Sequence, residues 1–317
     1  MIEVINPGLF SLIVDGGRQG RGALGVPLSS ALDGYAYRAL SMLLKNDRLA
    51  AIEAMGPNFA VRFSAPLVCA LTGARVRAFL DDDPVADWSS FPVRTGQTLR
   101  VRQILQGARY YLAFSRPLVL DEFMASFSTN LDARFGGYQG RPLAKGDIIE
   151  TGEDRDVPPA FVVPSSIPDL TPPHRLRVLV GPEADHFSEE DLAGFFSADG
   201  PFRYRVSRSA NRVGIRLEGG PPLTFRDGVP RSIVSEPLLP GTVQVPGDGL
   251  PIIVLYERTI GGYARAAVVC RADLPLLAHL RPGDAVSFMK ISEEEARLDH
   301  EEAVGALKIQ EIEGADH

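Results

Sequence analysis

Apolar residues in this chain recur in short runs closed by glycine or proline, which is the pattern of short β-strands. Turn signals such as Thr72-Gly73 and Thr95-Gly96-Gln97 separate these runs in the first half of the chain. The strands predicted there are residues 9–14, 59–63, 67–71, 76–80, 99–102 and 108–114. Their regular spacing predicts an antiparallel barrel or sandwich.

The second half repeats this alternation of short apolar runs and turns. Its predicted strands are residues 176–180, 203–206, 215–217, 242–245, 252–255, 264–269 and 285–288. Helical periodicity is confined to a few short segments, so the predicted fold class is mainly β with a few short helices.

The clearest helix follows Ser30-Ala31-Leu32-Asp33, which fits the capping-box pattern, and Asp33 is expected to cap it. We expect Asp47 to cap a second short helix that ends near Glu53. Glu53 lies among apolar residues, so its carboxylate needs a buried partner, and we expect an arginine. Other short helices are predicted to begin at Ser188, Asp273 and Ser292, the last with Glu295 in a capping box.

Residues 153–175 contain six prolines and no helical or alternating period, which predicts an extended linker. We therefore expect a first domain over residues 1–155, a proline-rich linker over 156–175 and a second domain over 176–307. The tail, residues 308–317, is expected to be frayed or to pack on a partner.

Composition narrows the possible partners. The chain has 317 residues with 40 acidic and 33 basic side chains, a net charge of −7, which argues against nucleic acid or an anionic membrane as the main partner. No apolar run is long enough to span a membrane and the N-terminus lacks the features of a signal peptide, so we expect a cytoplasmic protein. Cys69 and Cys270 lie in apolar runs and are expected to be buried free thiols.

The densest group of candidate site residues lies between Gly241 and Tyr263. Gln244 lies in one predicted strand, and Glu257, Arg258 and Thr259 follow the next, just before Gly261-Gly262-Tyr263. Charged and hydroxyl groups beside a glycine pair suit a binding site, because backbone or ligand can come close there. An acid–base pair at a solvated strand end is the alternative, and both interpretations stay open.

Glycine-rich and polar loops supply further candidates. Residues 15–22 contain Asp15 and Arg18 and could hold a phosphate or carboxylate, or could be a mobile surface loop. Residues 126–141 and 207–214 form two more polar loops, each either functional or flexible. Asp81-Asp82-Asp83 is expected to be a hairpin turn, and no metal site is predicted.

Seven motifs, in order along residues 3 to about 300, make the chain similar to the carboxyltransferase/allophanate hydrolase subunit 2 family. The family includes the C subunit of 5-oxoprolinase, the kinase-inhibitor antagonist protein and the carboxyltransferase part of urea amidolyase. The matching segments are residues 6–20, 25–33, Asn46 with Glu53, 72–74, 136–147, 211–217 (Asn-Arg-Val-Gly-Ile-Arg-Leu) and 244–263 with Gln-Val-Pro and Thr-Ile-Gly-Gly-Tyr.

This resemblance implies two tandem cyclophilin-like β-barrel domains and one subunit of a 5-oxoprolinase-like, ATP-dependent amide hydrolase that opens 5-oxoproline to glutamate. It implies as partners a smaller subunit of the same system and a third catalytic subunit. One alternative is a biotin-dependent carboxyltransferase subunit that acts on urea or a related amide. Another is a non-catalytic regulator that binds a kinase inhibitor protein.

The chain departs from the family pattern at several positions. The glycine pair after Ala113 is replaced by Ser115-Arg116, and the family's Gly-Ser-Arg-Ser-Thr reads Ala125-Ser126-Phe127-Ser128-Thr129. The arginine lost at Phe127 could have bound an anion, so anion binding at that point is in doubt, and with it activity on the same amide.

We expect a site in a cleft between the two barrels. Gln244 and Asn211 would bind the amide, and Arg212, Arg18 and Arg258 would hold an anion or a developing oxyanion. Glu257 or Asp15 would be the general base, with Arg212 also in the catalytic group. Thr259 and Tyr263 would complete the substrate-binding residues, although an inter-strand salt bridge is the alternative role for Arg212 and Glu257.

Overall fold

The computed structural model describes residues 1–197 and 199–312, which form two compact units. The first unit comprises residues 1–19, 29–170 and, within the described part, those from Ala306 onward. The second comprises residues 20–28 and 171–305. Strands account for 38% of the structure and helices for 14%, so the prediction of a mainly β fold is confirmed.

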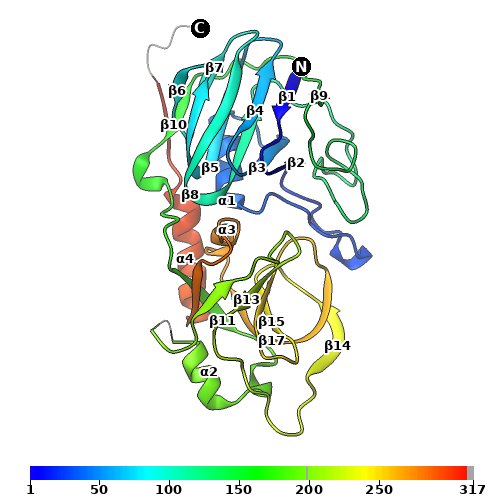
Figure 1. Ribbon diagram of the computed structural model, residues 1–317, viewed down its shortest axis with the longest axis vertical. Helices are drawn as coiled ribbons and strands as arrows, with labels where there is room; N and C mark the ends of the chain where they lie inside the picture. Colours follow the sequence, from blue (N-terminus) through cyan, green and yellow to red (C-terminus); the bar gives the residue numbers. More distant parts are fainter. Residues whose placement is uncertain (198, 313–317) are drawn as a thin grey trace. The chain divides into compact units, whose positions relative to one another are not determined.

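Two long strands, β5 (Leu67–Leu80) and β8 (Thr98–Phe114), form the centre of the first unit and pair antiparallel along most of their length (Figure 1). β8 pairs on its other edge with two different strands, through Leu99–Val101 with β4 (Phe59–Phe63) and through Arg109–Leu112 with β3 (Ala51–Met55). The sheet thus divides into two branches at β8.

Shorter strands extend these branches. β4 leads to β1 and β9, β3 leads to β2, and β5 leads to β6 and through β7 to β10 and β19. Their bounds are β1 Ile2–Asn6, β2 Phe10–Val14, β6 Asp83–Val85, β7 Ser89–Val93, β9 Ile148–Ile149, β10 Ala160–Val162 and β19 Ile309–Glu311.

The turn predicted at Thr72-Gly73 is a β-bulge inside β5. Gly73 has φ +94°, and a Cβ there would lie 2.7 Å from the carbonyl oxygen of Arg109. The pairing of β5 with β8 shifts register directly after Gly73. The two runs predicted as separate strands at 67–71 and 76–80 are therefore one bent strand, because glycine permits the bulge without ending the ladder.

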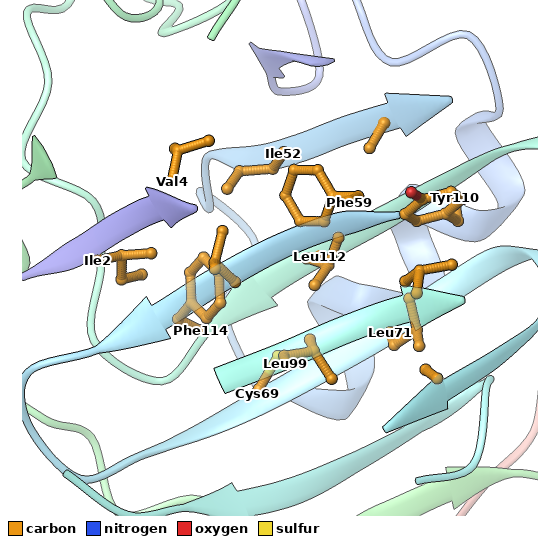
Figure 2. Close-up of a cluster of buried hydrophobic side chains, with 14 of the residues drawn as sticks. Ile2, Val4, Ile52, Phe59, Cys69, Leu71, Leu99, Tyr110, Leu112 and Phe114 are labelled. Carbon is orange, nitrogen blue, oxygen red and sulfur yellow. The ribbon is translucent and has the colours of Figure 1, made fainter. Parts of the chain in front are cut away.

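Both faces of the β5–β8 region are buried. One face contributes Cys69, Leu71 and Leu112 to a core that includes side chains from β1, β3 and β4 (Figure 2). The other face packs against α1 (Gly34–Leu43), whose residues Ala36, Ala39 and Leu40 are fully buried. Burial on two faces explains why these strands read as continuous apolar runs.

The second unit contains a closed barrel of seven strands, in the order β11-β18-β12-β13-β16-β15-β17 and back to β11. β11 and β18 pair in parallel, and the other neighbours in the ring pair antiparallel. β14 (Ser232–Pro237) pairs outside the ring with β17. The ring strands are β11 His174–Val180, β12 Tyr204–Val206, β13 Gly214–Glu218, β15 Thr242–Val245, β16 Ile252–Val254, β17 Ile260–Val269 and β18 Ala285–Lys290.

Three predicted helix caps are present. Asp33 accepts a hydrogen bond from Ala36 N, Ser188 accepts one from Asp191 N, and Ser292 and Glu295 form a capping box. The helices besides α1 are α2 Glu189–Phe195, α3 Leu274–Leu277 and α4 Glu293–Ala306, with 3-10 turns at Gly22–Leu24, Pro164–Ser166 and Ala184–His186. Within the described ranges, none of the helices is long and apolar enough to cross a membrane.

Three other predictions are wrong in part. Residues 51–55 form β3 rather than the end of a helix, because Glu53 pairs between Leu12 and Tyr111 inside the sheet. The linker predicted over 156–175 contains β10, whose Ala160 and Val162 are buried despite the surrounding prolines. In the tail predicted as frayed or docked on a partner, β19 pairs with β10.

The pairing of β19 generates a prediction about stability. Ile309 packs against the core around α1, whereas its neighbour Gln310 is exposed. We expect Ile309→Ala to lower the free energy of unfolding by about 1–2 kcal/mol, because it removes partly buried apolar surface. Urea denaturation of the full chain measures this, with Gln310→Ala as the control, expected to change stability by less than ~0.5 kcal/mol. Equal effects of the two substitutions would contradict the packing of Ile309.

Candidate functional site

Asp15 joins the glycine-rich loop that begins at Asp15 to the polar loop around Ser126–Ser128. Its carboxylate accepts four hydrogen bonds, from the hydroxyls of Ser126 (2.7 Å) and Ser128 (2.8 Å) and from the backbone N–H groups of Gly17 (2.8 Å) and Phe127 (2.5 Å). Asp15 N in turn donates to the Ser128 hydroxyl at 2.7 Å. A carboxylate with this many donors is well suited to holding a loop in one conformation.

Arg18 lies beside this group and is almost fully buried. Its Nη2 donates to the carbonyl oxygen of Ser128 at 2.6 Å, and its guanidinium lies 4.6 Å from the centre of the Phe135 ring. Gly136 makes room for it, because a Cβ there would lie 2.6 Å from Arg18 Nη2. The cation is thus held by a carbonyl and an aromatic face.

Ser126 and Ser128, which lie in the predicted polar loop 126–141, contact Asp15 but are not among the predicted site residues. Alternate residues of an extended chain point to the same side, and this Ser-x-Ser spacing was the available signal. Phe127 lies between them and packs against the core of the first unit. The departure from the family pattern at Phe127 therefore lies at a position whose side chain faces the core rather than Asp15.

Glu53 has the arginine partner that its burial predicts. Arg109 Nε lies 3.5 Å from Glu53 Oε1, with 9% and 1% of the two side chains exposed, and Leu32 N donates to Glu53 Oε2 at 3.2 Å. Burial, with the nearby carboxylates of Glu53 and Asp33, raises the pKa of Tyr111 well above its ordinary value. Tyr111 is thus a neutral hydroxyl that accepts from Asp33 N.

Gln244 lies on β15 at a rung of the barrel where the pairing is irregular. Val243 lies opposite Ala267 and Gln244 opposite Arg265, so β17 has one extra residue at this point. The Gln244 side chain is buried, and its Nε2 donates to the carbonyl oxygen of Tyr263 at 3.3 Å. The structure therefore brings two predicted substrate-binding residues together through the Tyr263 backbone, while the Tyr263 ring is exposed.

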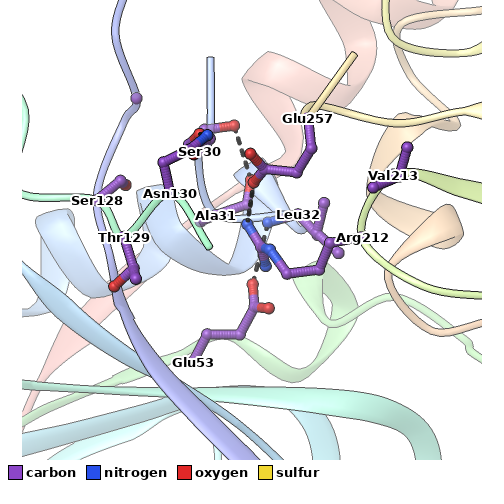
Figure 3. A network of polar contacts seen from close by, with 12 residues as sticks. Ser30, Ala31, Leu32, Glu53, Ser128, Thr129, Asn130, Arg212, Val213 and Glu257 are labelled. Atoms are coloured by element: carbon purple, nitrogen blue, oxygen red, sulfur yellow. Dashed lines mark hydrogen bonds and ion pairs between the residues drawn. The ribbon is translucent and has the colours of Figure 1, made fainter. Parts of the chain in front are cut away.

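Arg212 and Glu257 form an ion pair in the second unit (Figure 3), with Nη2 and Oε1 3.3 Å apart and 7% and 9% of the side chains exposed. The register of β13 and β16 accounts for this pairing. Gly214 lies opposite Val254, and Leu255 N donates to the carbonyl oxygen of Val213, so the residues just beyond the two strands meet. The predicted salt bridge is present, and a catalytic role for the pair stays a prediction.

The remaining predicted residues have more local contacts. The Asn211 side-chain oxygen accepts from Val213 N and Gly214 N, which shapes the turn before β13. Arg258 is exposed, and the Thr259 carbonyl accepts from Leu238 N. Their roles in binding stay predictions.

A second arginine–carboxylate group in this unit was not predicted. Arg265 makes a bidentate contact with Glu183, at 2.7 and 2.5 Å, and also binds Glu236 at 2.7 Å. These hydrogen bonds lower the pKa of Glu183. Arg265 lies opposite Gln244 in the barrel, so its contacts with Glu183 and Glu236 stabilise β17 where the pairing with β15 is irregular.

The mainly β fold and the seven sequence motifs are typical of one protein family. Residues 24–290 match the model of the carboxyltransferase domain, subdomains A and B, and the chain belongs to this family. The resemblance stated from the sequence motifs is thereby confirmed.

Two relatives differ in how much of their length the chain matches. It is 34% identical to the C subunit of 5-oxoprolinase from Escherichia coli over 299 residues, 93% of each chain. It is 29% identical to urea amidolyase of Saccharomyces cerevisiae over 97% of this chain but only 17% of the relative. The crystal structure of K. lactis urea amidolyase superposes with a TM-score of 0.87 at 27% identity, covering 96% of this chain and 20% of that one. The homologues are thus subunits or domains of enzymes.

The loop around Asp15 generates a prediction at Ala125. Met124 and Ala125 both have positive φ (52° and 62°) in a tight turn where Phe123 N and Ser126 N donate to each other's carbonyl oxygens. A residue with a Cβ is strained there, so we expect Ala125→Gly to raise the free energy of unfolding by about 1 kcal/mol. Urea denaturation tests this against Ala133→Gly, an exposed position in the same loop without positive φ, which should lower stability. Destabilisation by both would contradict strain at Ala125.

The Glu183–Arg265 contact generates a prediction about pH. Because the pKa of Glu183 is lowered in the folded state, the contact stabilises the fold above the unfolded pKa of about 4.3, and this stabilisation is lost as pH falls through the folded value. We expect Glu183→Gln to be less stable than the wild type near neutral pH, and the difference to shrink below about pH 4. Denaturant unfolding between pH 3 and 7 measures this, and a difference independent of pH would contradict it.

Proposed function

We propose that the chain is one subunit of an ATP-dependent amide hydrolase of the 5-oxoprolinase type. The observation that carries this proposal is the match to the C subunit of 5-oxoprolinase, which spans 93% of both chains. A match over the whole length of a relative supports a common role better than a match to 17% of a much longer chain.

The proposed reaction opens 5-oxoproline to glutamate. The ring C–N bond breaks, water supplies the hydroxyl of the new carboxylate, and hydrolysis of ATP to ADP and phosphate consumes a second water and drives the opening. We assign ATP binding to the assembled complex, which would include a smaller subunit of the same system and a third catalytic subunit. The residues of this chain would bind the amide and stabilise charge on it.

Within this chain, Glu257 is better placed than Asp15 to act as the general base. The Asp15 carboxylate already accepts four hydrogen bonds that hold its loop. Glu257 lies beside Arg212, so a base and a donor for a developing oxyanion adjoin each other. Gln244 and Asn211 would bind the amide, Arg18 and Arg258 would hold anionic groups, and Thr259 and Tyr263 would line the substrate.

The energetics of the Arg212–Glu257 pair favour a functional role over a purely stabilising one. Removing two charges from water costs several kcal/mol per ion, and their attraction offsets this cost only when further hydrogen bonds are present. A nearly buried pair is therefore by itself weak evidence of a stabilising role. Their arrangement is useful where charge develops on a substrate, since donors that are already oriented need little reorganisation.

The family model itself supports a second candidate, a subunit that transfers a carboxyl group from carboxybiotin to urea or a related amide. The chain matches a carboxyltransferase domain over residues 24–290 and superposes on urea amidolyase with a TM-score of 0.87. Both reactions require binding of a small amide, and they differ in the cofactor. The second candidate needs a biotinylated carrier and the first does not.

The two candidates are separated by assaying the complex reconstituted with its partner subunits. We expect ATP hydrolysis that depends on 5-oxoproline and yields glutamate without a biotinylated protein. ATP hydrolysis that depends on urea and on a biotinylated carrier would support the second candidate instead. Binding of a kinase inhibitor protein without amide-dependent ATP hydrolysis would exclude both.

In the same complex we expect Arg212→Ala to lower kcat by about 10²–10³-fold and Glu257→Gln by about 10²–10⁴-fold. The matched controls are Arg226→Ala and Glu189→Gln, because Arg226 and Glu189 form an exposed ion pair in the same unit, 2.6 Å apart. These controls should leave kcat unchanged. Wild-type turnover in Arg212→Ala and Glu257→Gln would remove the pair from the mechanism.

A further inference from the structure

The carboxamide of Gln244 has a fixed orientation in the barrel. Its side chain is 6% exposed, and its one hydrogen bond among the described residues runs from Nε2 to the carbonyl oxygen of Tyr263 at 3.3 Å. A carbonyl oxygen can only accept, so the NH₂ group must face Tyr263 and the carboxamide oxygen must face away from it.

The carboxamide oxygen is therefore an acceptor held ready for a donor. Among the residues that the structure describes, none donates to Gln244 Oε1. Gln244 is only 6% exposed, so this oxygen has little access to water and has lost part of its hydrogen bonding with water. A ligand that brings an N–H group to this oxygen would recover that loss.

Gly261 determines where this carboxamide lies. A Cβ at Gly261 would lie 2.5 Å from Gln244 Nε2 and 2.9 Å from Gln244 Oε1, and also 2.6 Å from Leu238 Cδ1. The backbone of Gly261 is not in the positive-φ region, so conformation does not require glycine there. The requirement is steric, since the carboxamide lies against the Gly261 Cα.

The extra residue in β17 acts together with this close approach. β-Bulges re-aim side chains at the edges of sites, and this bulge lies opposite Val243 and Gln244. Three features of β17 therefore constrain the Gln244 side chain of β15: the bulge, Gly261 and the Tyr263 carbonyl.

We propose that Gly261 is a positioning residue that holds the Gln244 carboxamide with its oxygen toward the substrate, so that the site selects amides that have an N–H group. This inference rests on the proposed function for its substrate class, a small amide or lactam. Gly261 acts through Gln244 and does not itself contact the reacting atoms. The site should therefore reject amides whose nitrogen is fully alkylated.

The steric contact is tested first in the chain alone, by thermal unfolding. We expect Gly261→Ala to lower Tm in the wild type and to lower it less in a Gln244→Ala background, where the clash with the carboxamide is relieved and only the contact with Leu238 remains. Gly247→Ala is the control, because a Cβ there would meet only Arg231 at 3.6 Å or more. Additive effects of Gly261→Ala and Gln244→Ala would overturn the positioning role.

The selectivity is tested in the complete complex by comparing kcat/KM for 5-oxoproline and 1-methyl-5-oxoproline. We expect the wild type and Gly247→Ala to prefer 5-oxoproline by about 10- to 100-fold, since the methylated lactam leaves the Gln244 oxygen without a donor. Gln244→Met, which keeps the side-chain volume, should abolish this preference. Gly261→Ala should reduce it in the same direction.

The outcomes separate this inference from the proposed function. Turnover of 5-oxoproline with no preference for the N–H compound would overturn the inference and leave the reaction standing. Turnover of urea but not of 5-oxoproline, with rejection of tetramethylurea that Gln244→Met abolishes, would overturn the proposed reaction and support the inference. Turnover of none of these amides would overturn both the reaction and the substrate class.

Discussion

The closed ring of strands in the second unit is the constraint on which the candidate site depends. In a closed barrel each strand is paired on both edges, so its register cannot slip without breaking hydrogen bonds all round. Among the described pairings of the ring, the register shifts at one place, between Val243 and Gln244. A single β-bulge in an otherwise regular barrel can change the direction of one side chain while the neighbouring strand pairs keep their register. This explains how Gln244 can be both buried and held in one orientation.

The first unit fixes its polar loop in a different way. Here a single carboxylate, Asp15, collects hydroxyl and backbone donors from a segment more than one hundred residues away in the chain, including Ser128. Gly136 and Gly137 have positive φ and leave no space for a Cβ against Ser128 and Thr129. The loop is thus ordered by hydrogen bonds and close backbone packing. Such a scaffold suits side chains that must hold one geometry.

Much of this could be predicted from local sequence. β4 and β15 match the predicted residues, and Asp33 caps its helix because its side chain needs only the neighbouring turn. The arginine partner of Glu53 was also predictable, since a buried carboxylate requires one, but its identity as Arg109 depends on the pairing of β3 with β8. Burial of the Glu53 carboxylate implies that it has a cationic partner, but which arginine this is depends on how the strands pair.

The failures have a common physical cause. The sequence predicts a turn at Gly73 and a linker where β10 lies, because glycine and proline mark both chain reversals and irregular strands. Which of the two occurs depends on whether a distant strand offers hydrogen bonds. The bidentate contact of Arg265 with Glu183 was missed for the same reason, since its partners are far apart in sequence.

The difference in length between the relatives bears on what this chain contributes under the proposed function. The chain corresponds to nearly all of the 5-oxoprolinase relative but to a small part of urea amidolyase, and both relatives have names that denote an amide or lactam. Under the proposed function, the two reactions would share the binding of a small amide. An amide presents an N–H donor on one side and a carbonyl acceptor on the other, and the chain offers an oriented acceptor in Gln244 and a nearly buried donor in Arg212. Under the proposed function, these two groups would recognise and polarise the amide.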